Sequence, residues 1–281
     1  MSSVAHYGRL AVFESEAAKL PAFVRRNFLE AWSYRAVFFF DFIALAFELF
    51  TFYFIAKMVD PDTLPRFGSE QVSYLEFVSV GIAISGFVGL ALVRAGAAFR
   101  GEQLTGTLEM LLMTPTAAST IQFGLVVYDL IYIPLRTAVF FAVIVLALDV
   151  RLAADGVMPA ILTLVFFIPF VWGLGIVLSA ATLTFKRGGA AFIAPVLTLT
   201  SGAFFPLTLL PDWLRAVAEW NPMAIAIDTI RGALLGDAGW SEVGSAIAVL
   251  VPASVISLAL GIVSFRLAVR RERRRGTLGL Y

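Results

Sequence analysis

Two pairs of charged side chains stand seven residues apart inside apolar stretches of the sequence. Asp41 and Glu48 form one pair, and Asp129 and Arg136 form the other. Seven residues are close to two turns of an α-helix, so the members of each pair share a helix face. A charge at the middle of a membrane helix costs about 2.5–3.5 kcal/mol on insertion scales, so these groups must face protein or water rather than lipid.

The simplest relief for such charges is an ion pair between neighbouring helices. Arg136 is the one cation of the four, and it can pair with Asp129, Glu48 or Asp41. Three roles stay open for this set: a structural ion pair, a polar lining of a substrate path, or proton coupling.

A second patterned segment, RGEQLTGTLEMLLMTPT at 100–116, lies between two apolar stretches. Thr105, Gly106 and Thr107 favour a turn or a helix start, because threonine caps helices and glycine adopts unusual backbone angles. Pro115 marks the end of the short helix that follows, because the residue before a proline is disfavoured in helical geometry.

The side chains of this short helix divide into two faces. Leu108, Leu111 and Leu112 form an apolar face that we expect to turn toward the rest of the protein. Glu102 and Glu109 are seven apart and share a face if the helix is continuous. We expect these acids and the nearby hydroxyls to face the cytoplasm, where they can accept arginines of a partner protein. A plain polar turn between two spans is the alternative.

The elements that must position these groups are membrane helices. The chain is 60% hydrophobic and 15% charged over 281 residues, whereas soluble domains carry roughly 25% charged residues. A span needs about 20 mostly apolar residues, and its backbone groups must bond internally, which favours helices. The sequence predicts an all-α membrane protein with six spans, at 37–57, 74–99, 121–148, 157–183, 190–210 and 246–267.

The distribution of Lys and Arg predicts how these spans are oriented. Of the 21 basic residues, 15 lie in 1–36, 94–120, 184–190 and the segment from Arg266 onward. By the positive-inside rule, both termini and the 100–116 loop lie in the cytoplasm.

Three parts of the chain follow from this orientation. Residues 1–36 form a cytoplasmic N-terminal segment, 37–268 the six-helix transmembrane domain, and 269–281 a basic cytoplasmic tail. Within the first part, segment 21–35 is predicted to be an amphipathic helix at the membrane interface, with Pro21 in its first turn. The arginines of the tail are expected to bind anionic membrane lipids, at about 1 kcal/mol each, rather than nucleic acid.

The segment after residue 203 interrupts the apolar pattern on the predicted outer side. Pro206 and Pro211 break the apolar run, and Trp213 suits the interface belt of a membrane protein. Broken backbone at membrane depth is tolerated only where protein buries it or where it lines a cavity. We therefore expect short re-entrant helices that close the path from outside, with an ordinary external loop as the alternative. The expected outer gate comprises Phe204, Phe205, Pro206, Trp213, Asn221 and Pro222.

The sequence offers no catalytic or nucleotide-binding pattern. A P-loop needs Gly-Lys followed by Ser or Thr, and none of Lys19, Lys57 and Lys186 follows a glycine. One histidine and no cysteine leave no set of residues with metal-ligand spacing. We expect no cofactor, no metal and no ATPase activity in the chain itself.

The loop at 100–116 resembles the cytoplasmic loop of the type-2 (ABC-2) permease family of ABC transporters. The matching residues are Glu102, Gly106-Thr107-Leu108-Glu109, Leu111-Leu112 and Thr114-Pro115. A second stretch resembles the family's outer signature: Ser201-Gly202-Ala203-Phe204-Phe205-Pro206, Leu210-Pro211-Asp212-Trp213-Leu214 and Trp220-Asn221-Pro222, followed by Asp228 and Arg231. The two motifs stand in the family's order, and the resemblance covers about 95–235.

The resemblance implies a fold and partners that the spacing did not show. It implies an architecture like that of type V ABC exporters, with six spans, an N-terminal interfacial helix, a cytoplasmic coupling helix and outer re-entrant helices. Two permeases form a dimer, and each binds a separate nucleotide-binding subunit that holds ATP and magnesium. By this resemblance the residues that couple the ATPase subunit to the permease are Glu102, Thr105, Gly106, Thr107, Leu108 and Glu109.

The family default is ATP-dependent export of a drug, a lipid or a glycan across the cell membrane. An ATP-independent channel or lipid scramblase is the alternative, and a membrane enzyme that uses Asp41 and Glu48 as an acid–base pair is a third class. Co-purification with a cytoplasmic ATPase separates the first class from the other two.

Overall fold

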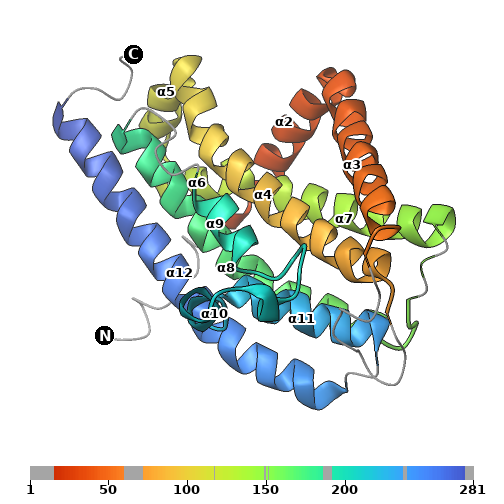
Figure 1. Cartoon of the computed structure of the whole chain (residues 1–281). Helices are drawn as coiled ribbons and strands as arrows, with labels where there is room; N and C mark the ends of the chain where they lie inside the picture. Colours follow the sequence, from red (N-terminus) through yellow and green to blue (C-terminus); the bar gives the residue numbers. More distant parts are fainter. Residues whose placement is uncertain are drawn as a thin grey trace.

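The structure is a computed structural model, and it describes residues 16–59, 72–116, 118–148, 150, 152–185, 192–236 and 239–275. Every regular element within these ranges is a helix (Figure 1). The helices in chain order are α2 (Leu20–Ser33), α3 (Arg35–Ala56), α4 (Tyr74–Leu104), α5 (Thr107–Met113), α6 (Ala118–Val126), α7 (Asp129–Leu148), α8 (Val157–Phe185), α9 (Ile193–Leu199), the 3₁₀ turn η2 (Leu207–Leu209), α10 (Asp212–Ala218), α11 (Pro222–Leu235) and α12 (Trp240–Arg275).

The bundle has two ends that carry different structures. One end holds α5 and the last turns of α12, and we call it the α5 end (Figure 1). The opposite end holds α10 and α11, and we call it the α11 end (Figure 1). The 100–116 loop lies at the α5 end, so the predicted orientation makes the α5 end the cytoplasmic side and the α11 end the outer side.

Five segments among the described residues are long and apolar enough to cross a membrane. They are Phe39–Ala56, Tyr74–Leu104, Phe123–Leu146, Val157–Phe185 and Trp240–Glu272, and they match five of the six predicted spans. The sixth prediction, 190–210, is not among them: α9 is seven residues long, and residues 186–191 lie outside the described ranges. After α9 the backbone turns through Gly202, whose φ of 68° ends helical geometry.

The predicted third span is divided into two helices. α6 ends at Val126 and α7 begins at Asp129. The carbonyl of Tyr128 accepts hydrogen bonds from the N–H groups of Ile131 and Tyr132, at 3.1 and 3.0 Å, and so starts a new helix. Asp129 therefore lies in the first turn of α7, where the helix dipole favours a carboxylate.

The core of the bundle forms around α8, which packs against α4, α11 and α12. The hydroxyl of Ser179 on α8 donates to the carbonyl of Ala95 on α4 at 2.6 Å, and Ser257 on α12 donates to that of Phe170 on α8 at 2.9 Å. Small residues permit this approach: a Cβ added at Gly173 would lie 2.3 Å from the Ser257 hydroxyl.

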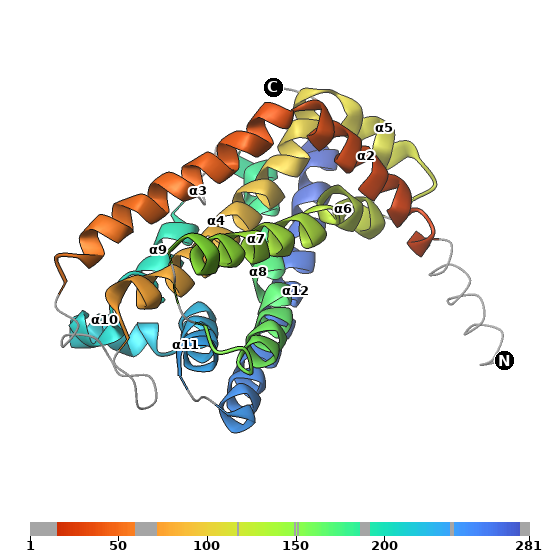
Figure 2. The same cartoon turned by 90° about the vertical axis from the view of Figure 1, so that its right-hand side faces the viewer.

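The helix α3 contacts this core much less than the others do. It lies at the edge of the bundle in both views (Figures 1 and 2) and packs mainly on α4. One face of α3 is exposed and strongly aromatic, with Phe39, Phe40, Phe47, Phe50 and Phe54 each more than half exposed. Such a face requires lipid or another protein chain beside it.

Candidate functional site

The loop at 100–116 begins with a break between two helices. α4 ends at Leu104, and Gly106 adopts the left-handed conformation with φ of 73° before α5 begins at Thr107. A side chain would strain this position, which explains the glycine. α5 ends at Met113, directly before an extended residue that precedes Pro115, as predicted. Because of the break, α4 and α5 present no continuous helix face.

The leucines of α5 turn toward the bundle, as predicted. Leu108 is only 3% exposed, and Leu111 and Leu112 pack at the edge of the same cluster. Outward from this cluster, α5 exposes Met110 and Met113, at 69% and 83%. One face of the short helix is therefore buried, and the other presents a methionine surface at the α5 end.

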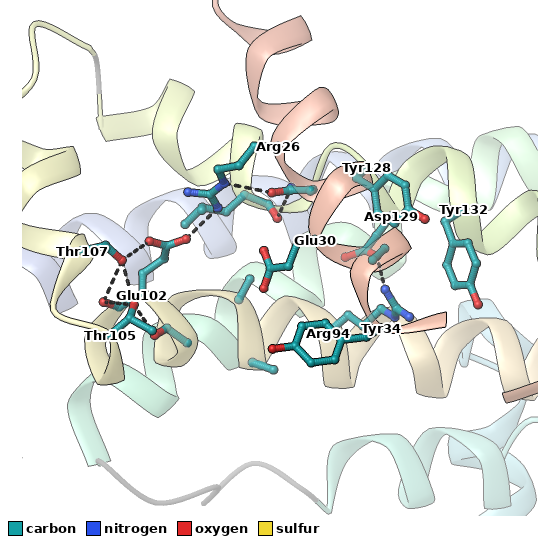
Figure 3. A pocket seen from close by; sticks show the side chains of 16 residues that line it. Arg26, Glu30, Tyr34, Arg94, Glu102, Thr105, Thr107, Tyr128, Asp129 and Tyr132 are labelled. Atoms are coloured by element: carbon teal, nitrogen blue, oxygen red, sulfur yellow. Dashed lines mark hydrogen bonds and ion pairs between the residues drawn. The ribbon is translucent and has the colours of Figure 1, made fainter. Parts of the chain in front are cut away.

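Glu102 does not face solvent freely, and the prediction that it does was wrong. Its side chain is 13% exposed and accepts a hydrogen bond from Arg26 Nη2 at 2.6 Å (Figure 3). The hydroxyl of Thr107 also donates to this carboxylate, across the break between α4 and α5 (Figure 3). Thr105 donates to the carbonyl of Gly101 at 3.0 Å. The side chain of the second predicted acid, Glu109, lies outside the described atoms.

The arginine that binds Glu102 comes from α2, the predicted amphipathic helix. The sequence placed this helix correctly, with Pro21 in its first turn, but it gave no sign of which element α2 contacts. Asn27 of α2 donates to the carbonyls of Gly124 and Leu125 on α6, at 3.3 and 3.1 Å. We call the set Arg26, Asn27, Glu102, Thr107 and Gly124 the α2 junction.

Close packing brings α2 and α6 together at this junction. A Cβ added at Gly124 would lie 2.5 Å from the ring of Phe23, so the glycine makes room for that ring. At the start of α2, Lys19 Nζ donates to the carbonyl of Pro115 at 2.8 Å. The helix α2 is therefore tied to the end of α4, to α6 and to the segment after α5.

A second cluster lies along the same groove and centres on Arg94. Its guanidinium contacts Asp129 at 2.9 Å and Asp41 at 3.7 Å, and it lies 4.6 Å from the centre of the Tyr132 ring. The Tyr132 hydroxyl donates to Asp41 at 3.3 Å. We call Arg94, Asp41, Asp129 and Tyr132 the Arg94 network.

This network corrects the predicted pairing of Arg136. Asp41 and Asp129 are bound by Arg94 rather than by Arg136. Arg136 interacts electrostatically with Glu48, the third predicted partner, and it is only 8% exposed. Its Nε has no hydrogen-bond partner among the described residues. Arg94 lies within the predicted span 74–99, and that position is the signal by which its role can be recognised.

All members of the α2 junction except Gly124, and all members of the Arg94 network except Asp41, line one cavity of about 620 Å³. It opens between α2, the second half of α4 and the α6–α7 break, as Figure 3 shows from close by. The lining is formed by Arg26, Asn27, Glu30, Ala31, Tyr34, Arg94, Ala97, Ala98, Gly101, Glu102, Thr105, Thr107, Leu125, Tyr128, Asp129 and Tyr132. The cavity thus joins the predicted coupling loop to Asp129, one of the four predicted intramembrane charges, and Asp41 contacts it through Arg94.

The α11 end carries a third cluster, which is closed. Arg231 of α11 is fully buried and donates to three backbone carbonyls: Phe77 at 2.9 Å, Gly202 at 2.8 Å and Ala203 at 2.6 Å. Its guanidinium also lies 3.6 Å from the centre of the Phe77 ring. We call these groups the Arg231 cluster. They join α11 to the first turns of α4 and to the break after α9.

The surroundings of Arg231 account for its charge state and for the small residues nearby. Burial lowers the pKa of the Arg231 guanidinium, and the carboxylate of Asp228, 3.7 Å away, acts in the opposite direction. A Cβ added at Gly81 would lie 1.8 Å from the carbonyl oxygen of Ala203. A side chain at Gly81 would therefore prevent residues 202–203 from reaching the position where their carbonyls accept the Arg231 hydrogen bonds.

The predicted outer gate residues divide between this closed structure and the surface. Phe204 stacks on Phe52 of α3 with ring centres 5.2 Å apart, and its carbonyl accepts from the Tyr74 hydroxyl at 3.0 Å. Pro206 is buried, Phe205 is partly buried, and Trp213 is 72% exposed.

Asn221 and Pro222 start α11 and join it to α9. The Asn221 side chain accepts from the N–H of Met223 and donates to the carbonyl of Leu197 and the hydroxyl of Thr200, each at 2.9 Å. Pro222 occupies the first turn of α11, as is common for proline. Short helices at 212–218 and 222–235 confirm that the segment is helical.

Comparison with known proteins gives one match. The family model described as "ABC-2 type transporter" matches residues 19–235, from the start of α2 to the end of α11. None of the curated proteins compared with the chain matches it. The matched range includes the α2 junction, the Arg94 network and the Arg231 cluster.

Proposed function

Because the chain belongs to the ABC-2 type transporter family, we propose that it is the permease subunit of an ATP-dependent exporter. In this proposal a separate nucleotide-binding subunit binds ATP and magnesium and docks at the α5 end, which lies in the cytoplasm. The substrate is hydrophobic or amphipathic, and the chain carries it across the cell membrane. A second permease copy completes the path, and the exposed aromatic face of α3 is available for that copy or for lipid.

The observation that carries the proposal is the Arg26–Glu102–Thr107 chain of contacts. Arg26 belongs to α2, Glu102 to the end of α4, and Thr107 to the start of α5. One partly buried carboxylate therefore joins the three helices that meet beside the loop. A force applied to α5 reaches α2 and α4 through this carboxylate, and α4 continues through the bundle to the Arg231 cluster. In this proposal Glu102 and Thr107 brace the surface that the partner contacts, whereas Thr105 and Gly106 lie on that surface.

The contact surface itself is better described by the exposed residues of the loop. Leu104, Met110 and Met113 are 62%, 69% and 83% exposed at the tip of the α5 end. Exposed apolar side chains in one place favour a protein partner, and methionine adapts its shape to such partners. Thr105 and Gly106 lie between them and are also exposed.

A charge-exchange experiment tests this proposal. The full-length chain is isolated from its native membrane in a mild detergent, and ATP hydrolysis by the co-purified subunit is measured. We expect Arg26→Glu and Glu102→Arg each to lower that hydrolysis about tenfold, because each leaves a like-charge pair in a partly buried place. The double variant, which restores an opposite-charge pair, is expected to recover most of the activity.

Two results would count against the proposal. If the wild-type chain carries out transport without any co-purified ATPase, an ATP-independent channel or scramblase is the better description. If both single variants keep full ATP hydrolysis, the α2 junction does not transmit the nucleotide-driven movement. Arg25→Glu is the matched control, because Arg25 lines a different surface of α2, outside the cavity.

A further inference from the structure

The cavity between α2 and the Arg94 network carries a charge that its own residues leave uncompensated. Its lining includes three carboxylates and two guanidinium groups. Arg26 is bound by Glu102 at 2.6 Å, and Arg94 is bound by Asp129 at 2.9 Å. The remaining carboxylate, Glu30, has no hydrogen bond and no ion pair with any described residue. Figure 3 shows it between the two pairs, with no dashed line to a neighbour.

Aromatic rings line the same cavity as this free carboxylate. Tyr34, Tyr128 and Tyr132 line the cavity. The rings of Tyr128 and Tyr132 are stacked with centres 5.7 Å apart and an interplanar angle of 12°, so they form one continuous wall. Arg94 already covers Tyr132. Tyr34 is 66% exposed and Tyr128 is partly exposed between Tyr132 and Phe28, so a ligand can reach both rings, and the face of a tyrosine ring attracts cations.

The position of the cavity favours access from the membrane surface. The helix α2 forms one wall and exposes Phe28, Leu29 and Trp32, at 48%, 47% and 56%. A helix with such a face lies in the interfacial layer of a membrane. Molecules with a charged group and an apolar body concentrate in this layer, beside the helix that forms this wall of the cavity.

We propose that this cavity binds an organic cation with an apolar body, with Glu30 as its counter-ion and Tyr34 and Tyr128 as its aromatic contacts. The volume of about 620 Å³ is within the range of small-molecule sites. Ala31, Ala97, Ala98 and Leu125 provide apolar walls. An anionic group is disfavoured, because both guanidinium groups of the lining are already paired. The inference names the substrate class of the proposed exporter and therefore rests on the proposed function.

Binding of tetraphenylphosphonium tests the inference. The full-length chain is placed in nanodiscs of zwitterionic lipid, and binding is measured by equilibrium dialysis without nucleotide, with empty nanodiscs subtracted. We expect saturable binding that Glu30→Gln weakens about fivefold, as for a partly exposed charge pair. Tyr128→Leu is expected to weaken binding about threefold, through loss of the cation–π contact. Glu242→Gln changes an exposed acid in the first turn of α12 at the other end, and it is expected to leave binding unchanged.

Tetraphenylborate, measured alone in a separate assay, separates charge selection from apolar partition, because it has the same shape and the opposite charge. We expect no saturable binding of tetraphenylborate to the wild-type chain. Equal saturable binding of both ions, or unchanged affinity in Glu30→Gln, would overturn the inference. Since the assay contains no ATPase, a negative result combined with the expected effects of the Arg26 and Glu102 variants would reject only the substrate class. Glu30 has no bonded partner to lose, so the variant is expected to fold.

Discussion

Arg94 and Arg231 place the same guanidinium group inside one helical bundle in two different ways. Arg231 is fully buried and bonded to three backbone carbonyls on α4 and on the break after α9. Arg94 is 29% exposed and contacts two carboxylates, Asp41 and Asp129, on separate helices. Backbone carbonyls cannot move without moving the chain, whereas carboxylate side chains beside a cavity can exchange partners.

This difference indicates that the two ends of the molecule have different roles. At the α11 end, the chain breaks after α9, and Arg231 supplies the donors that a continuous helix would have supplied. At the α5 end, side-chain pairs join α2, α3, α4 and α7 around an open cavity. We infer that the α11 end is a fixed closure in this state and that the α5 end is where helices are free to move. Four substitutions test this contrast.

Replacement of Arg231 is expected to have the largest effect. Arg231→Met removes the side-chain donors from three carbonyls, two of which (Gly202 and Ala203) lie outside any helix, and we expect the free energy of unfolding to fall by about 3–5 kcal/mol. Unfolding in mixed micelles, followed by tryptophan fluorescence, measures the change. Arg215→Met is the matched control: Arg215 also donates to two carbonyls at the α11 end, but its side chain is 37% exposed. A loss of less than about 1 kcal/mol is expected there, and equal losses in both variants would contradict the contrast.

Gly81→Ala tests the same closure at its contact with α4. The new Cβ would lie 1.8 Å from the carbonyl oxygen of Ala203, and backbone cannot yield as a flexible side chain does. We expect a loss of about 2–3 kcal/mol in the free energy of unfolding. Gly89→Ala on the same helix has nothing within 4 Å of the added Cβ, so it is expected to be neutral or slightly stabilising. A neutral Gly81→Ala would mean that the break after α9 is not held against α4.

The sequence predicted the local structure better than the contacts between helices. Residues at 21–35 and 100–116 were placed correctly because proline, glycine and helical spacing act over a few positions. The break at Tyr128 was missed, since a run of apolar residues has the same composition whether or not a helix restarts within it. The prediction of a continuous span at 190–210 was wrong for the same reason. Apolar content does not distinguish a lipid-facing helix from a broken segment that is buried beside Arg231.

Charge pairing was the least predictable feature. Helical spacing correctly put Asp41 with Glu48 and Asp129 with Arg136 on common faces, but it contains no distance between helices. Arg94 binds both Asp41 and Asp129 because α4 lies between α3 and α7. Only the tertiary structure shows this arrangement. The sequence also did not indicate the ion-pair partner of Glu102, because Arg26 is 76 residues away in the chain.

The salt dependence of the free energy of unfolding is a smaller effect that distinguishes Arg94 from Arg231. Arg94→Leu leaves Asp41 and Asp129 close together and partly hydrated, and we expect a loss of about 1–2 kcal/mol in the free energy of unfolding. Ions reach this partly exposed cluster, so the loss is expected to shrink between about 0.05 and 0.5 M salt. The loss in Arg231→Met is expected to stay constant over the same range. The same salt dependence for both variants would show that the α11 end is open to solvent.

The smallest effect on global stability is expected at Gly124, where α2 packs on α6. A Cβ there would lie 2.5 Å from the ring of Phe23, a side chain on a surface helix that can move away. We therefore expect Gly124→Ala to change the free energy of unfolding by less than about 0.5 kcal/mol. The ring's displacement is expected to weaken the Asn27 hydrogen bonds to α6 and to raise amide hydrogen exchange in α2 about tenfold.

Gly101→Ala is the control for Gly124→Ala, because nothing lies within 4 Å of a Cβ added there although the position faces the same cavity. It is expected to leave exchange in α2 unchanged. If Gly124→Ala lowers global stability as much as Gly81→Ala does, then α2 is part of the core and the α5 end is as fixed as the α11 end. If α2 alone exchanges faster, local opening at the α2 junction is separable from the fold. A junction that opens separately from the fold is what a partner acting on α5 requires.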